Sequence, residues 1–128
     1  MRCIFPLVFA LVVALHSNAA VASDGNRLLQ YCGDVERFVD GGNSTSNPLG
    51  IGFCFGLMEG ITYSNALYKI RAPGKEFLCL PKGGVTNGQA ARVGLVVLRY
   101  LRDHPEQLHE KASFLAVLAL VDAFPCYR

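Results

Sequence analysis

Cysteine is the residue of this 128-residue sequence with the clearest chemical meaning. Cys3 precedes an apolar N-terminal run, and four more cysteines follow at Cys32, Cys54, Cys79 and Cys126. The apolar run has the character of an export signal, so Cys3 would leave with it. The four cysteines that remain are an even number, which in a small exported domain is typical of two disulfides. Metal binding is disfavoured because there is no CxxC pair, and because His104 and His109 lie five residues apart, off a common helical face. The sequence therefore predicts two disulfides, no metal and no cofactor.

Histidine is the second candidate for chemistry. His104 and His109 flank the segment PEQL, with Glu106 and Glu110 nearby, so a histidine–carboxylate dyad is one hypothesis. Histidines at helix junctions more often cap a helix or lie in solvent. No GxSxG, HExxH or paired-aspartate motif is present, and no cysteine is expected to be free as a nucleophile. These observations predict a protein that is not an enzyme.

The elements that hold these residues are predicted to be helices. Apolar residues from Leu28 to Val39 follow the i, i+3, i+4, i+7 spacing of a helix over 26–40, which Gly41 would end. The following segment GGNSTSNPLGIG is predicted to be a loop, and a second helix is expected over 53–69.

Two glycines of the second helix, Gly56 and Gly60, are four residues apart and so share one face. Glycine weakens a helix by about 1 kcal/mol relative to alanine. We therefore expect another backbone to approach closely at this face. A phosphate-binding loop is disfavoured because the Walker and Rossmann spacings are absent.

The second half of the chain predicts a loop and two more helices. RAPGKEFLCLPKGG is expected to be a loop with a short extended piece at EFLCL. Thr86 and Gln89 have the spacing of a capping box, which predicts a third helix ending near Asp103, before Pro105. The fourth helix, 110–124, is apolar on nearly every side, so we expect it in the centre of a bundle or at a subunit interface. A membrane-spanning helix is disfavoured because the run is short and contains Asp122. The predicted fold class is all-α, a small four-helix bundle-like domain stapled by two disulfides.

Four cysteines allow three pairings, and the sequence alone does not choose among them. Cys32 and Cys54 lie on consecutive predicted helices, so a bond between them would close a helical hairpin. This placement favours the pairs Cys32–Cys54 and Cys79–Cys126. The second bond would tie the middle loop to the C-terminal tail.

The N-terminus has the order of a secretory signal peptide: Arg2, the apolar run CIFPLVFALVVAL, and the small residues HSNAAVAS. We expect cleavage after Ala22 or Ser23, which divides the chain into a signal peptide, 1–22, and one domain, 23–128. A membrane anchor is the alternative, but the run is shorter than the ~20 residues a span needs. Loss of Arg2 lowers the net charge from +2 to +1. This balance predicts no nucleic-acid partner and no stable membrane insertion after cleavage.

Several motifs together resemble a known family. They are CxGxxxG at Cys54–Gly60, CLP, VTNGQ, YLRDHPEQLHEKA and ALVDAFPC. The sequence is similar, from about Leu28 to Cys126, to the Rap/Tai-type periplasmic immunity proteins, which protect bacteria from type VI secretion peptidoglycan amidases. It departs from the family pattern at Leu57-Met58 and by one extra residue in CLPKGGVT. The resemblance implies a non-catalytic periplasmic protein, often a homodimer, that binds a cognate amidase effector and blocks its active site.

An occluding inhibitor needs a rigid segment that loses little entropy on binding. The proline-restrained loop RAPGKEFLCLPKGG fits this need, and its candidate contact residues are Lys75, Glu76, Lys82 and Gly83. The narrow polar strip of the third helix is a second candidate surface, with Arg92, Leu95 and Arg99 beside Arg102 and Asp103. A solvated charged strip explains the same pattern. The alternative function is an exported helical module that binds a small apolar ligand.

Overall fold

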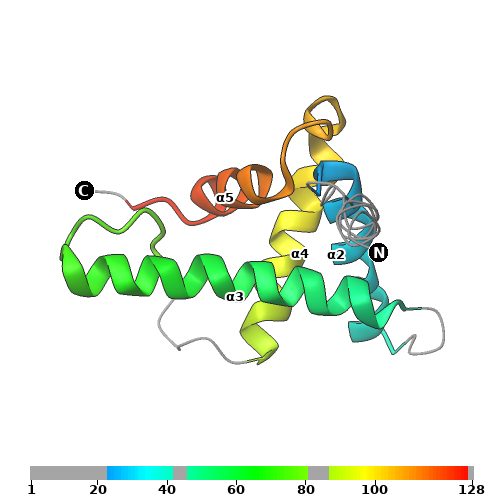
Figure 1. Ribbon diagram of the computed structural model, residues 1–128, viewed down its shortest axis with the longest axis horizontal. Helices are drawn as coiled ribbons and strands as arrows, with labels where there is room; N and C mark the ends of the chain where they lie inside the picture. The colour runs from blue at the N-terminus through cyan, green and yellow to red at the C-terminus, as the bar shows by residue number, and fades with distance from the viewer. Residues whose placement is uncertain (1–22, 42–45, 81–86, 127–128) are drawn as a thin grey trace, which may run out of the picture.

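The computed structural model describes residues 23–41, 46–80 and 87–126. In these residues the chain forms α2 (Gly25–Val39), α3 (Pro48–Arg71), α4 (Asn87–Asp103), the short 3-10 helix η1 (Pro105–Gln107) and α5 (Ala112–Ala123). Figure 1 shows α3 running along almost the full length of the molecule. Helix α2 packs against both α3 and α4, and α5 packs mainly against α4. The all-α prediction is confirmed.

Helix α2 begins at a side-chain cap. The carboxylate of Asp24 accepts a hydrogen bond from the backbone N–H of Arg27 at 2.9 Å, which satisfies a donor of the first turn. Leu28, Cys32 and Val35 on the predicted apolar stripe are all fully buried. The predicted helix over 26–40 agrees with the structure to within one residue at each end.

Helix α3 begins at Pro48, five residues before the predicted start. The side chain of Asn47 accepts from the N–H of Leu49 at 3.0 Å, and Pro48 occupies the first helical position, which its fixed φ favours. Buried Asp34 of α2 accepts a hydrogen bond from the N–H of Asn47 at 3.0 Å. The prediction that PLGIG belongs to a loop is therefore wrong.

The second half follows the expected order. Helix α4 ends at Asp103, before Pro105, as predicted, whereas the proposed cap at Thr86 lies outside the described residues. Phe77–Leu80 forms no strand. Leu115, Ala116, Ala119 and Leu120 of α5 are buried, but Phe114 and Val121 are exposed. Within this chain α5 is therefore a surface helix with one covered side, so it does not occupy the centre of the bundle, and the alternative of a subunit interface stays a prediction.

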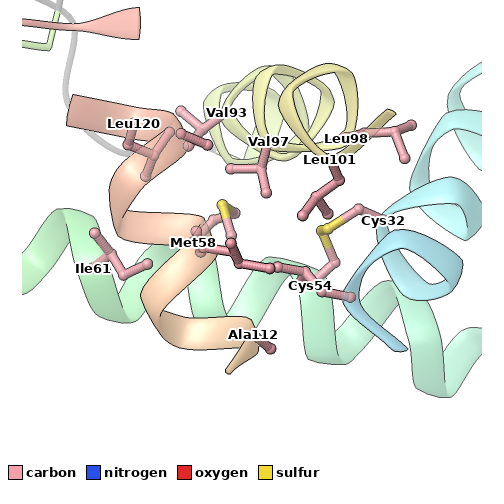
Figure 2. Packing of buried hydrophobic residues seen from close by; sticks show 14 of the residues in the cluster. Cys32, Cys54, Met58, Ile61, Val93, Val97, Leu98, Leu101, Ala112 and Leu120 are labelled. Atoms are coloured by element: carbon pink, nitrogen blue, oxygen red, sulfur yellow. A yellow bond between two sulfur atoms is a disulfide. The ribbon is translucent and has the colours of Figure 1, made fainter. Parts of the chain in front are cut away.

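The core lies where α2, α3, α4 and α5 meet, and one disulfide passes through it. Figure 2 shows the sulfur atoms of Cys32 and Cys54 bonded beside Met58 and Leu101. Gly94 of α4 permits this packing, because a Cβ there would lie 3.2 Å from the Sγ atom of Cys54. The second disulfide joins Cys79 to Cys126. Both favoured pairings are confirmed.

The start of the described chain is held against the turn before α5. The N–H of Ala112 donates to the carbonyl of Ser23 at 2.8 Å, and the N–H of Gly25 donates to the carbonyl of Glu110 at 2.9 Å. A Cβ at Gly25 would lie 2.9 Å from backbone atoms of Leu108, so the approach requires glycine. Among the described helices, none combines the length and apolarity that crossing a membrane requires.

Candidate functional site

The loop after α3 is anchored by one buried side chain. Asn65 of α3 accepts hydrogen bonds on Oδ1 from the N–H groups of Phe77 at 3.2 Å and Leu78 at 3.0 Å. Its Nδ2 donates to the carbonyl of Leu78 at 2.8 Å. The side chain of Leu78 is buried in the core. These contacts hold residues 77–78 against α3 without any regular secondary structure.

A second anchor follows immediately. Cys79 is bonded to Cys126, and the N–H of Cys79 donates to the carbonyl of Phe124 at 3.0 Å. Figure 1 shows the loop folding back from the end of α3 to meet the segment that follows α5. The loop is therefore fixed to two elements that are far apart in the sequence.

The exposed part of this loop presents charge. Gly74 has a positive φ of 77°, and the N–H of Lys75 donates to the carbonyl of Ala72 at 3.0 Å, which makes a tight turn. Lys75 is exposed, and half-buried Glu76 has its Oε1 4.0 Å from Nζ of Lys69. Lys82 and Gly83 lie outside the described residues.

A charged cleft of about 280 Å³ lies between α2 and α4. Its lining joins two of the predicted contact residues to four charged neighbours: Glu36, Asp40, Leu95, Arg99, Arg102 and Asp103. Arg92 is exposed but does not line this cleft. The cleft and the 72–80 loop share no residue, so the structure separates the two predicted surfaces.

One ion pair spans the cleft. Nη1 and Nη2 of Arg102 donate to Oε1 and Oε2 of Glu36 at 2.9 and 2.6 Å. These hydrogen bonds hold the pKa of Glu36 below its ordinary value and raise the pKa of Arg102. Both Nη1 and Nη2 of Arg102 are therefore used in a contact within the fold. Arg99 is exposed and lines the same cleft.

Sequence reasoning missed two acidic residues of this cleft. Glu36 lies in the last turn of α2 and Asp40, four residues on, is the residue that caps this helix; the two line the cleft together. That i, i+4 spacing of carboxylates was the available signal. What the sequence did not supply was the neighbouring helix, since the pairing of Glu36 with Arg102 spans 66 residues.

An apolar groove of about 370 Å³ lies over α3, beside the loop and α5. It is lined by five residues of α3, by one residue of the loop and by one of α5: Gly56, Leu57, Gly60, Ile61, Ser64, Phe77 and Val117. A Cβ added at Gly56 or Gly60 would meet no atom of the described residues within 4 Å. The prediction that another backbone of this chain packs closely against these glycines is therefore wrong.

The surroundings of His104 and His109 indicate structural roles for both histidines. Nδ1 of His104 lies 2.9 Å from the carbonyl oxygen of Tyr100, and its ring stacks on the Tyr100 ring with centroids 4.1 Å apart. The imidazole thus satisfies a carbonyl at the end of α4. His109 is exposed beside Glu110. In residues 23–41, 46–80 and 87–126, no group of three His, Cys, Asp or Glu side chains is placed to hold a metal ion.

Together these observations define a small helical protein stapled by two disulfides, with a doubly anchored loop and a charged cleft on its surface. The chain belongs to the Rap1a immunity protein family, which it matches over residues 24–126. Immunity proteins of this kind act in type VI secretion, bind cognate effectors and are not enzymes. No curated protein and no solved structure matches the chain. The predicted family and the prediction of a non-enzymatic protein are confirmed.

The disulfides also bear on where the protein works. Structural disulfides persist in oxidising compartments and are rare in the reducing cytoplasm. A protein with both Cys32–Cys54 and Cys79–Cys126 formed is therefore extracytoplasmic.

Proposed function

We propose that this protein is a periplasmic immunity protein that binds a type VI peptidoglycan amidase effector and blocks its active site sterically. The observation that carries the proposal is the double anchoring of the 72–80 loop by Asn65 and by the Cys79–Cys126 disulfide. A segment that is already ordered loses little conformational entropy when it enters another protein's cleft.

The charges around the loop suit recognition. Lys75 is exposed at the tight turn, and Glu76 is half-buried beside it. In the cleft, exposed Arg99 stands beside half-buried Leu95. Arginine next to apolar surface is common at the centres of protein interfaces. The loop is the proposed inhibitory segment, and the cleft is a second contact.

Export of the chain is the second part of the proposal. Residues 1–22 are the signal peptide, and residues 23–128 form the periplasmic domain. The hydrogen bond from Ala112 to the carbonyl of Ser23 supports a boundary here, since the folded domain uses the chain from Ser23 onward. N-terminal sequencing of the exported protein tests this boundary, and a start well after Asp24 would contradict it.

The functional test measures protection and inhibition together. Cells that receive an amidase effector in the periplasm should survive when they export this protein, and the purified protein should inhibit that amidase. Lys75→Glu should weaken inhibition at least about tenfold, which corresponds to 1.4 kcal/mol. Lys111→Glu, the same charge reversal at an exposed site away from the loop, is the matched control.

A loop exchange gives the sharper result. Replacing residues 71–84 with those of a relative that protects against a different effector should transfer the specificity. If specificity stays with the rest of the chain, the loop is not the inhibitory segment. Copurified lipid in the apolar groove, without inhibition, would favour the alternative module for a small apolar ligand.

We also propose that two copies associate through the exposed face of α3. Large apolar side chains lie on this face on both sides of the glycines: Leu49 is 69% exposed and Tyr63 is 56% exposed. Both are seven residues from Gly56, so an antiparallel two-fold crossing at Gly56 would place Leu49 of one copy opposite Tyr63 of the other. The open glycines would let the two helices approach closely.

Light scattering after gel filtration tests the dimer. The wild-type protein should elute as a dimer, and Leu67→Glu, on the same face and 62% exposed, should elute as a monomer. Phe38→Glu on α2, 45% exposed, is the control and should remain dimeric. A monomeric wild-type protein at all concentrations would contradict the proposal.

A further inference from the structure

The two disulfides lie in opposite environments. Cys32 and Cys54 are both 0% exposed, and their bond is enclosed by the core side chains seen in Figure 2. Cys79 is exposed and Cys126 is half-buried, at the surface where the loop meets the segment after α5 (Figure 1).

This difference controls reactivity. A disulfide breaks when a thiolate attacks one of its sulfur atoms, so the rate depends on access to that sulfur. Because Cys79 is an exposed residue, we expect a thiolate to reach its sulfur in the folded protein. The bond between Cys32 and Cys54 itself joins α2 to α3, so its sulfur atoms become accessible only when α4 moves away from that pair, which requires a large part of the core to open.

We propose that Cys79–Cys126 is a redox-labile clasp, which a dithiol reductant opens in the folded protein while Cys32–Cys54 stays intact. The reductant is a small dithiol or a thiol–disulfide oxidoreductase of the extracytoplasmic space. This inference goes beyond the proposed function and does not depend on it.

The exchange balances as a two-electron reduction. A thiolate of the reductant attacks Sγ of Cys79, the S–S bond breaks, and Cys126 leaves as a thiolate that takes up a proton. The mixed disulfide joins the first sulfur of the reductant to Sγ of Cys79. The second thiol of the reductant then attacks that first sulfur, and Cys79 leaves as a thiolate that takes up a proton. The protein gains two electrons and two protons, and the reductant becomes a disulfide.

The contacts around the clasp define what its opening releases. Asn65 holds Phe77 and Leu78 through three hydrogen bonds that do not involve sulfur. The segment after α5 is tied to the loop by the disulfide and by the hydrogen bond from Cys79 to Phe124. Reduction therefore leaves the C-terminal segment tied to the loop only by the hydrogen bond from Cys79 to Phe124, which loosens this segment while the loop and the helical core remain in place.

Graded reduction of the folded, oxidised protein with dithiothreitol tests the clasp. Free thiols are alkylated at each concentration and located by peptide mass spectrometry. We expect a species that carries two labels, at Cys79 and Cys126, and Cys32–Cys54 should be reduced at least about tenfold more slowly. In guanidinium chloride the difference should disappear. Labels at all four cysteines together, labels at Cys32 and Cys54 first, or no labelling of the folded protein would each overturn the proposal.

Hydrogen exchange provides the second measurement. In the two-label species, protection should fall at the N–H of Cys79 and at the end of α5, whereas Leu78 and the helices α2 and α3 should stay protected. The double variant Cys79→Ser/Cys126→Ser should show the same pattern without reductant. Loss of protection throughout the core would mean that this bond holds the whole fold, and the proposal of a local clasp would be wrong.

Discussion

At the scale of single residues, Asn65 replaces the hydrogen bonds that a neighbouring strand would give the loop. The side chain is 7% exposed and satisfies two N–H groups and one carbonyl of residues 77–78. Buried backbone groups that lose such partners cost about 1–3 kcal/mol each. One side chain therefore fixes residues 77–78 of the segment that we propose to be inhibitory, and the Cys79–Cys126 disulfide fixes the residue that follows.

Asn65→Ala is predicted to lower the free energy of unfolding by about 2–4 kcal/mol, because it leaves these backbone groups without partners. Denaturant unfolding measures the loss. Ser64→Ala, which removes only an exposed bond to the carbonyl of Gly60, is the control and should cost less than about 1 kcal/mol. Equal effects of the two changes would contradict the role of Asn65.

Glu36 is the residue whose titration should be visible in stability. Its pKa is lowered in the folded protein, first by the hydrogen bonds from Arg102. The unfolded chain therefore binds the proton more readily, so the stabilisation is present above the ordinary glutamate pKa and is lost as the pH falls through the lowered value. Because both side chains are more than a third exposed, this contribution should stay below about 1 kcal/mol.

Glu36→Gln should accordingly reduce the free energy of unfolding at neutral pH by that small amount and remove its part of the decline in acid. Unfolding curves of the two proteins between neutral and acidic pH measure it. A difference between the two that grows as the pH falls would have the wrong sign.

At the scale of elements, the glycines have unlike roles. Gly25 lets the start of α2 lie against the backbone of Leu108, whereas a Cβ at Gly56 would contact none of the residues that the structure describes. The sequence pattern predicted a close backbone contact at Gly56 and Gly60, because two glycines four residues apart in a helix are typical of close packing. The required glycine was instead at a helix end.

Alanine substitutions at Gly25 and at Gly56 should therefore change the free energy of unfolding in opposite directions. Gly25→Ala is predicted to destabilise the fold by about 1–3 kcal/mol, because its Cβ would lie 2.9 Å from backbone atoms of Leu108. Gly56→Ala should stabilise the monomer by about 0.5–1 kcal/mol through helix propensity. Thermal unfolding at low protein concentration separates the two, and destabilisation by both would contradict the assignment.

At the scale of the whole molecule, the two disulfides stabilise the fold in different ways. In the chain-entropy description, the 47-residue separation of Cys79 and Cys126 contributes up to about 4 kcal/mol, and the 22-residue separation of Cys32 and Cys54 up to about 3.4 kcal/mol. The inner bond also fills the core between α2, α3 and Gly94 of α4. Packing and entropy thus rank the two bonds in opposite order.

We predict that Cys32→Ala/Cys54→Ala lowers the free energy of unfolding more than Cys79→Ser/Cys126→Ser does. The inner pair loses its packing in addition to its cross-link. Denaturant unfolding of the two double variants decides the order. A larger loss from the outer pair would mean that chain entropy outweighs core packing in this protein.

The sequence by itself determined the helical class, most helix boundaries and the family, and it favoured the disulfide pairs that the structure confirms. Each of these depends on local patterns: apolar spacing in 26–40, the stop before Pro105, an even number of cysteines, and motifs such as CLP and AFPC. A local signal for the early start of α3 was also present, since Asn47-Pro48 is a recognisable helix start.

Only the tertiary structure decided the sites. The partner of Arg102 is 66 residues away, Asn65 reaches backbone that is 12 and 13 residues further along, and the openness around Gly56 depends on where α5 lies. No local pattern encodes such contacts, because they arise when helices that are separate in the chain are packed around one core. The same packing buries one disulfide and leaves the other at the surface.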